Sequence, residues 1–189
     1  GVCEIIDFQS SQGESQEAWE GFLNDLYKRG IFGKSCELII TDGGKGLHSA
    51  LEYIYPKILK QRCWAHKTRN ILDKVRKKDW DVVKKTLQRI PYAKNRREAT
   101  KAYWDFADKW RSIYPNAVKC LETDIEDLLT FFHIKEDRLW SKIRTTNAIE
   151  RAFREVRRRT RPIGVFTNRE SVERIVFAVF HHLNVNWEN

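Results

Sequence analysis

Asp42 is the carboxylate in this sequence that is best placed to do chemistry. It closely follows the short apolar run Leu38–Ile40, and two glycines, Gly43 and Gly44, come directly after it. A carboxylate at the carboxyl end of a buried strand points into the crevice where open α/β sheets bind ligands, and glycines there would let a bulky partner approach. An aspartate before glycine also commonly forms a turn by bonding its own backbone. Both roles are open for Asp42.

Glu150 is a second candidate acid. It lies on the flank of an expected amphipathic helix whose apolar stripe consists of Ile149, Ala152, Phe153 and Val156. Asn147 and Glu150 have the spacing of a capping box, and Glu150 and Arg154 have the spacing of an i,i+4 ion pair. The sequence therefore leaves chemistry, capping and pairing open for Glu150.

Arginine dominates the segment around Glu150. Between residues 138 and 161 nine side chains are basic and two are acidic, whereas a solvated helix face normally mixes the two signs more evenly. Guanidinium groups form bidentate bonds to phosphate oxygens, and such contacts hold a DNA backbone without reading its sequence. The predicted DNA-binding residues are Arg144, Arg151, Arg154, Arg157, Arg158, Arg159 and Arg161.

Cys63 and His66 form the motif Cys-Trp-Ala-His at the end of an expected strand. Zinc normally takes three or four protein ligands, and no second pair is spaced to complete such a site. Local packing or hydrogen bonding is therefore the favoured role, with zinc as the alternative. The wide spacing of the cysteines indicates neither a disulfide framework nor a complete zinc finger.

The elements that would position these residues begin as alternating strands and helices. Strands are expected at 2–8, 38–40 and 58–64 from their β-branched and apolar runs. A helix is expected from Ser15, an N-cap residue, to Gly30, a C-cap glycine, and a further helix after Gly44. This order predicts an α/β fold with some strands buried and parallel.

The rest of the chain is expected to be helical. Basic, Trp-rich amphipathic patterns run from 67 to about 139, and two stronger helices follow at about 147–160 and 168–186. The last helix should begin with Thr167 and Glu170 as a capping box. The predicted domains are the amino part of the core at 1–66, an all-helical insertion at 67–140 and the carboxyl helices of the core at 141–189.

Charge is segregated along the chain. The formal net charge is +9, yet residues 1–56 hold four Lys or Arg against nine Asp or Glu, while residues 57–189 hold 31 against 17. Such segregation is typical of nucleic-acid binders. No run of 18 apolar residues exists, and the amino end lacks a signal-peptide pattern. We therefore expect an intracellular protein that does not contact membranes.

Together these residues resemble the Mutator-type transposases of bacterial and archaeal insertion sequences. The resemblance covers nearly the whole chain, and the block around Glu150 is highly specific. It rests on Glu14-Ser15-Gln16-Glu17-Ala18-Trp19, Ile40-Thr41-Asp42-Gly43, Gln61-Arg62-Cys63-Trp64-Ala65-His66, Thr145-Thr146-Asn147-Ala148-Ile149-Glu150-Arg151, Arg157-Arg158-Arg159-Thr160-Arg161 and Ile163-Gly164-Val165-Phe166.

The resemblance implies a ribonuclease H-like fold and an activity of DNA strand cleavage and joining. It also implies a cytoplasmic, nucleoid-associated location in a prokaryote. It implies that Asp42 and Glu150 are the second and third acids of an Asp, Asp, Glu triad that binds Mg²⁺, with Mn²⁺ as an alternative. Such carboxylates hold two metal ions about 3.5–4 Å apart for in-line phosphoryl transfer. Cys63 and His66 would match the family's Cys-x-x-His signature, which, like Asn147, has a structural or DNA-positioning role.

One departure from the family pattern concerns the first acid of the triad. In the family this Asp lies upstream of the segment that matches residues 2–8, and Asp7 falls where the family usually has an uncharged residue. We therefore expect an amino-terminally truncated core whose first strand or strands are missing, whose metal binding is weakened and which self-associates through an exposed sheet edge. By itself such a fragment is expected not to cleave DNA.

Three functions remain in competition. They are a transposase catalytic-core fragment, a non-catalytic DNA-binding remnant of a transposase, and a ribonuclease H-like nuclease of another family. Asn147 and Glu150 within the Thr-Thr-Asn block favour the first over the third. The expected partner is DNA, as transposon ends and target.

Overall fold

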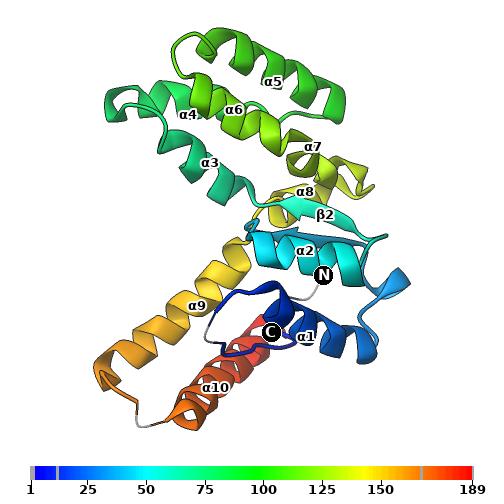
Figure 1. Cartoon of the computed structure of the whole chain (residues 1–189), viewed down its shortest axis with the longest axis vertical. Helices are drawn as coiled ribbons and strands as arrows, with labels where there is room; N and C mark the ends of the chain where they lie inside the picture. Colours follow the sequence, from blue (N-terminus) through cyan, green and yellow to red (C-terminus); the bar gives the residue numbers. More distant parts are fainter. Residues whose placement is uncertain (1–2, 12, 167, 189) are drawn as a thin grey trace. The chain divides into compact units, whose positions relative to one another are not determined.

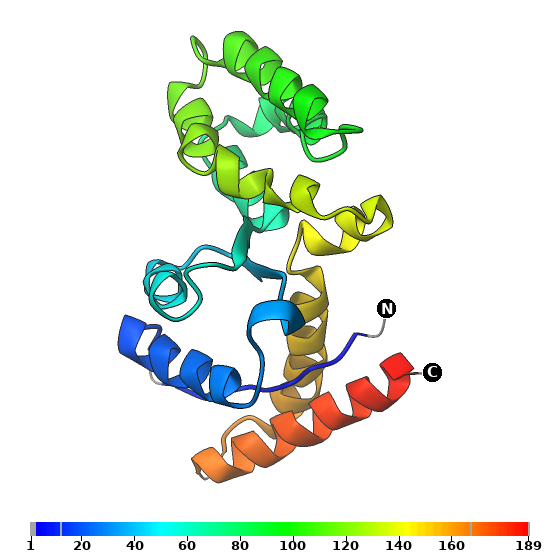
Figure 2. The same ribbon diagram turned by 90° about the vertical axis from the view of Figure 1, so that its right-hand side faces the viewer.

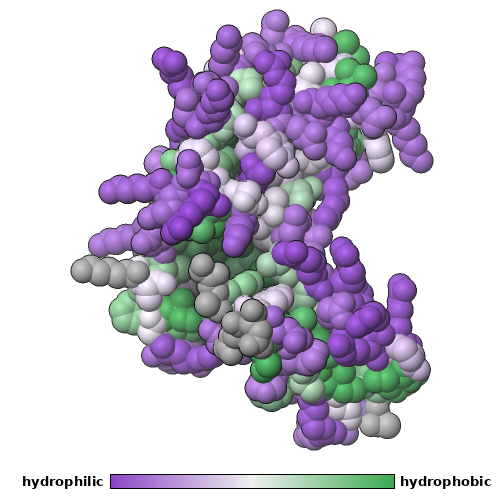
Figure 3. Space-filling view, turned by 180° about the vertical axis from the view of Figure 1, so that it is seen from behind, coloured by the Kyte–Doolittle hydropathy of each residue, from purple (hydrophilic) through white to green (hydrophobic). Residues whose placement is uncertain are grey.

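The computed structural model describes residues 3–11, 13–166 and 168–188 (Figure 1). They divide into two compact units, one formed by residues 1–13 with 147–189 and the other by residues 14–146. Hydrophilic side chains cover most of the face seen in Figure 3, in line with the mean hydropathy of −0.61. No helix of the described residues is long and apolar enough to cross a membrane.

The larger unit contains a parallel sheet of two strands, β1 (Leu38–Thr41) and β2 (Leu59–Arg62). The helix α2 (Lys45–Ile54) connects the strands, and α1 (Gln16–Lys28) packs against α2. Leu23, Leu26, Ala50, Leu51 and Tyr55 form the small buried core of these two helices. The strands expected at 38–40 and 58–64 and their parallel direction are confirmed, although the second strand ends at Arg62 and only Thr41 and Gln61 of the two strands are buried.

The ends of α1 follow from local sequence. Ser15 Oγ accepts a hydrogen bond from the backbone N–H of Ala18 at 3.3 Å, which caps the first turn. Gly30, with φ at +97°, occupies the left-handed region after the last turn, where glycine carries no steric penalty. Both predicted ends of this helix are confirmed.

Helices make up the remainder of the larger unit (Figures 1 and 2). Their largest fully buried side chains include Phe106, Phe131, Ile71 and Leu121. The first of them begins at Trp64, three residues earlier than expected, because the indole of Trp64 is buried and donates to the Leu128 carbonyl at 2.7 Å. The elements are α3 (Trp64–Leu72), α4 (Trp80–Gln88), α5 (Arg96–Trp110), α6 (Pro115–Thr123), α7 (Ile125–Leu128) and α8 (Asp137–Ile143), with the short 3₁₀ turns η1 (Gly33–Ser35), η2 (Lys77–Asp79) and η3 (Thr130–His133).

The smaller unit pairs α9 (Asn147–Thr160) with α10 (Arg169–Glu188), and the 3₁₀ turn η4 (Arg161–Ile163) follows α9. The core of this unit consists of Val176, Val179 and Phe180 of α10 together with Ala152 and Val156 of α9. Phe153 is 44% exposed, but its ring packs edge-on against Phe180 with the centroids 5.7 Å apart. Ile149 is 55% exposed, so the stripe predicted for α9 was too wide at this residue.

The strand expected at residues 2–8 is wrong for the residues that the structure describes. Residues 3–8 form no strand. The side chain of Asn184 on α10 replaces a neighbouring strand, since its Oδ1 accepts from the Ile5 N–H at 2.8 Å and its Nδ2 donates to the Ile5 carbonyl at 2.9 Å. Both backbone groups of Ile5 are satisfied without a sheet.

The start of α10 also differs in part from the expected capping box. Thr167 lies outside the described residues. Asn168 caps the helix, because its Oδ1 accepts from the Ser171 backbone N–H at 2.9 Å and from the Ser171 hydroxyl at 2.8 Å. An Asn side chain serves as an N-cap as well as Thr does.

Candidate functional site

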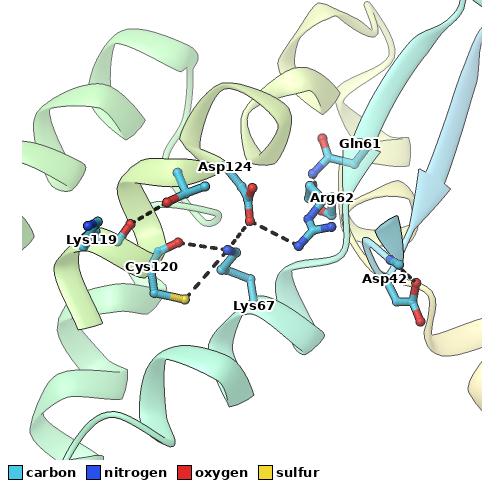
Figure 4. Close-up of polar contacts among 9 residues, drawn as sticks. Asp42, Gln61, Arg62, Lys67, Lys119, Cys120 and Asp124 are labelled. Carbon is cyan, nitrogen blue, oxygen red and sulfur yellow. Dashed lines mark hydrogen bonds and ion pairs between the residues drawn. The ribbon is translucent and has the colours of Figure 1, made fainter. Parts of the chain in front are cut away.

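Asp42 follows the last residue of β1, and its side chain is exposed. Its Oδ1 accepts a hydrogen bond from the Gly44 backbone N–H at 3.2 Å (Figure 4). The turn-forming role considered for Asp42 is thus real. It leaves the carboxylate open to solvent, so the turn fixes a group that can still bind a ligand.

The space next to Gly43 is filled by Arg62. Gly43 has φ at +91°, and a Cβ built on it would lie 1.0 Å from Arg62 Nη1. In the sheet register Arg62 is the partner of Thr41, which places its guanidinium against the turn that carries Asp42. The sequence pattern predicts that the glycines after Asp42 leave space for a bulky ligand. At Gly43 this space is occupied by the guanidinium of Arg62.

Arg62 is itself held by a buried charge network (Figure 4). Its Nη2 lies 3.2 Å from Asp124 Oδ2, and Lys67 Nζ forms an ion pair with the same oxygen. Lys67 also donates to the Cys120 carbonyl at 2.9 Å. The side chains of Lys67, Arg62 and Asp124 are 5%, 16% and 17% exposed. The sequence analysis did not predict this network. The available signal was a cation in an expected strand, Arg62, followed by a second cation, Lys67, which lies buried in α3.

Cys63, His66 and Thr146 come together at the end of β2. The Thr146 backbone N–H and hydroxyl each donate to Cys63 Sγ at 3.3 Å. His66 Nδ1 lies 3.3 Å from the same sulfur and 3.4 Å from Thr146 Oγ1. We call these three residues the Cys63 cluster. It joins the Cys-Trp-Ala-His motif to the Thr-Thr-Asn block, which the sequence alone did not connect.

Glu150 is half-buried in the first turn of α9, whose first residue is Asn147. It belongs to the smaller unit, whereas Asp42 belongs to the larger one. Asp42 thus follows a strand of the larger unit, and Glu150 lies on a helix of the smaller unit.

The arginines of α9 fall into two groups. Arg151, Arg154 and Arg157 are exposed, as is Arg161 after the helix. Arg158 and Arg159 both pair with Glu155, at 2.9 and 2.6 Å. The hydrogen bond from Arg159 holds the pKa of Glu155 below its usual range, so this carboxylate neutralises part of the positive face.

Arg144 has a different environment from the arginines of α9. Its Nη1 donates to the Pro91 carbonyl at 2.7 Å, and its guanidinium lies over the Tyr92 ring, 3.9 Å from the ring centroid. These contacts hold it within the larger unit.

Two carboxylates near the end of β1 could donate oxygen ligands to a metal ion. Asp42 Oδ1 and Glu14 Oε2 each lie 3.9 Å from the position of a Cβ on Gly44, and carboxylate oxygens are the ligands that Mg²⁺ prefers. Among the described residues, no group of three or more His, Cys, Asp or Glu side chains is placed to hold a metal. The donor chemistry of Asp42 and Glu14 fits Mg²⁺, and the two carboxylates lie near the same glycine of the turn.

Comparison with known proteins places these features in context. Residues 1–189 match the sequence model described as transposase, Mutator family. The chain is 37% identical over 188 residues to the transposase for insertion sequence element IST2 of Acidithiobacillus ferrooxidans, covering 99% of the chain and 62% of that protein. It is 34% identical over 190 residues to the transposase for insertion sequence element ISRM5 of Rhizobium meliloti, covering 99% and 46%. The chain thus spans about half of the length of the relatives it matches.

Proposed function

The chain belongs to the Mutator family of transposases, and from this premise we propose that it forms part of the catalytic core that cleaves and joins DNA strands when an insertion element moves. The observation that carries the proposal is the exposed carboxylate of Asp42 at the end of a parallel strand, held by the Gly44 N–H. Ligands of α/β proteins bind at this edge of a sheet.

We infer a ribonuclease H-like fold for the same core. Two parallel strands joined by a crossover helix support it, and the helical stretch after β2 suits an insertion before the acid of α9. The division into 1–66, 67–140 and 141–189 stays a prediction.

Asp42 and Glu150 are proposed to hold Mg²⁺, or Mn²⁺ in its place. Bound metal ions would activate the attacking oxygen and stabilise the departing one. Asp42 would present a carboxylate oxygen whose direction is set by the Gly44 N–H, while the Arg62 guanidinium occupies the space beside Gly43. Glu150 would supply its oxygen from the first turn of α9.

The exposed arginines of α9 are proposed to bind the DNA backbone. Arg151, Arg154, Arg157 and Arg161 are free to turn toward phosphates because they are exposed, whereas Arg158 and Arg159 would first have to leave Glu155. The contacts of Arg144 with Pro91 and Tyr92 give no support to a direct role in DNA binding. Transposon ends and target DNA would be the ligands.

The proposal can be tested in a chimera, because the chain aligns with 62% of the transposase for insertion sequence element IST2. Residues 1–189 replace the matching stretch of that protein, and excision of an element with the ends of that insertion sequence is measured. Asp42→Asn and Glu150→Gln should each abolish excision, while Asp25→Asn, a change at an exposed acid of α1, should not. Normal excision by both site variants would refute the assignment. A chimera that binds DNA without excising it would favour the non-catalytic alternative.

A further inference from the structure

The Cys63 cluster joins the end of β2 to Thr146, the residue before the first residue of α9. We propose that it is a positioning device, in which Cys63 and His66 fix the point from which α9, the helix of Glu150, begins. The inference rests on the proposed function only for the role of Glu150.

Cys63 is tied to the segment of the first acid. Its backbone N–H donates to the Thr41 carbonyl at 2.8 Å, and Asp42 is the next residue after Thr41. Its side chain is buried, with 1% of the residue exposed. The sulfur is therefore fixed relative to the end of β1, and it is not available as a flexible surface group.

The same sulfur holds the chain that leads to the second acid. Thr146 donates to it through both its backbone N–H and its hydroxyl. A further hydrogen bond, from the Trp64 N–H to the Arg144 carbonyl at 3.0 Å, ties the same stretch of chain a second time. Because Asn147 is bonded to Thr146, these contacts fix the starting point of α9 whatever direction the helix then takes.

His66 completes the cluster rather than a metal site. Its Nδ1 faces both the sulfur and Thr146 Oγ1, at 3.3 and 3.4 Å. Two donors of Thr146 already point at the sulfur, and a cation would have to displace them. Within the described part of the chain no third His, Cys, Asp or Glu joins the pair. Hydrogen bonding therefore accounts for the Cys-x-x-His spacing, since one turn of helix brings the imidazole back to the thiol.

The test compares Thr146→Val, which removes the hydroxyl and keeps the shape, with Thr146→Ser, which keeps the hydroxyl. Thr145→Val is the matched control. Amide hydrogen exchange is measured at Thr146 and at residues 151–153, whose N–H groups are the first that an α-helix starting at Asn147 can bond internally. Thr146→Val should speed exchange there by roughly three- to tenfold, the loss of one ordinary hydrogen bond. Thr146→Ser should restore it, and the amide of Phe106 in the helical core should not change.

Unchanged exchange in Thr146→Val, or an equal effect of Thr145→Val, would overturn the proposal. In the chimera, Thr146→Val should lower the rate at saturating DNA while leaving the KM for DNA unchanged, and Thr146→Ser should recover that rate. A lower affinity with an unchanged maximal rate would also contradict a positioning role. Amide exchange is measured without catalysis and therefore tests the role of the Cys63 cluster independently of activity. A chimera that excises nothing would refute the proposed function but would leave the exchange result valid.

Discussion

Replacing Asp124 with Asn should destabilise the larger unit strongly, because two poorly solvated cations share its carboxylate. Lys67 is 5% exposed and Arg62 16% exposed, so water can replace little of the lost charge. Breaking a buried ion pair costs about 3–5 kcal/mol. The hydrogen bond from Lys67 to the Cys120 carbonyl remains and offsets part of this. We therefore expect a loss of about 3 kcal/mol, a large fraction of the roughly 5–15 kcal/mol that stabilises a domain.

Urea unfolding followed by tryptophan fluorescence measures this loss, since the chain has seven Trp. With a slope of about 1–3 kcal/mol per molar urea, the midpoint should fall by roughly 1–3 M. Asp105→Asn, at an exposed acid of α5, is the matched control and should change stability by less than about 0.5 kcal/mol. In a Lys67→Met background the effect of Asp124→Asn should shrink, because one of the stranded cations is gone. Equal losses in the two backgrounds, or a loss below about 1 kcal/mol, would show that the network is not what holds this region together.

Three further outcomes are expected. Gly43→Ala should lower the melting temperature, because alanine is strained at φ +91° and its Cβ would displace Arg62. Gly13→Ala is the control and should leave the melting temperature unchanged, since no atom lies within 4 Å of the added Cβ. Burial raises the pKa of Asp127 above its ordinary value of 3.8. The ionised carboxylate therefore lowers the stability of the folded protein at pH values above the raised pKa, and this effect is absent below pH 3.8, where the group is protonated in both states. Asp127→Asn should therefore raise the melting temperature at neutral pH, and equal gains at about pH 3 and neutral pH would contradict this linkage. Alanine at Arg154 and Arg157 together should reduce the salt slope of duplex DNA binding by about 1.8, as measured by fluorescence anisotropy, and an unchanged slope would remove α9 from the interface.

Elements with strong local signals could be predicted from the sequence. Ser15 and Gly30 mark the ends of α1 because capping and the left-handed conformation depend on the residue itself. The strand expected at residues 2–8 failed for the opposite reason. A strand needs a neighbour, and the apolar pattern around Ile5 could not show that Asn184, 179 residues away, would take its backbone hydrogen bonds.

The surroundings of the candidate acids also depend on contacts between residues that are far apart in the sequence. Asp42 could be identified because a carboxylate after an apolar run is a local pattern. That Gly43 makes room for Arg62 could not, because it requires the register of β1 with β2. The link from Cys63 to Thr146 spans 83 residues and joins two polar groups that carry no hydrophobic periodicity.

The position of Arg62 bears on the proposed binding of a cation by Asp42. A guanidinium next to a metal-binding carboxylate would compete with the metal, since both are positive. Asp124 takes up the charge of Arg62, while Asp42 accepts only the neutral Gly44 N–H among the contacts described for its side chain. The negative charge of Asp42 is thus left for a ligand from solvent. Asp124 follows α6, within the all-helical stretch after β2, so that stretch contributes to the electrostatics of the acid at the end of β1 even though the acid itself lies outside it.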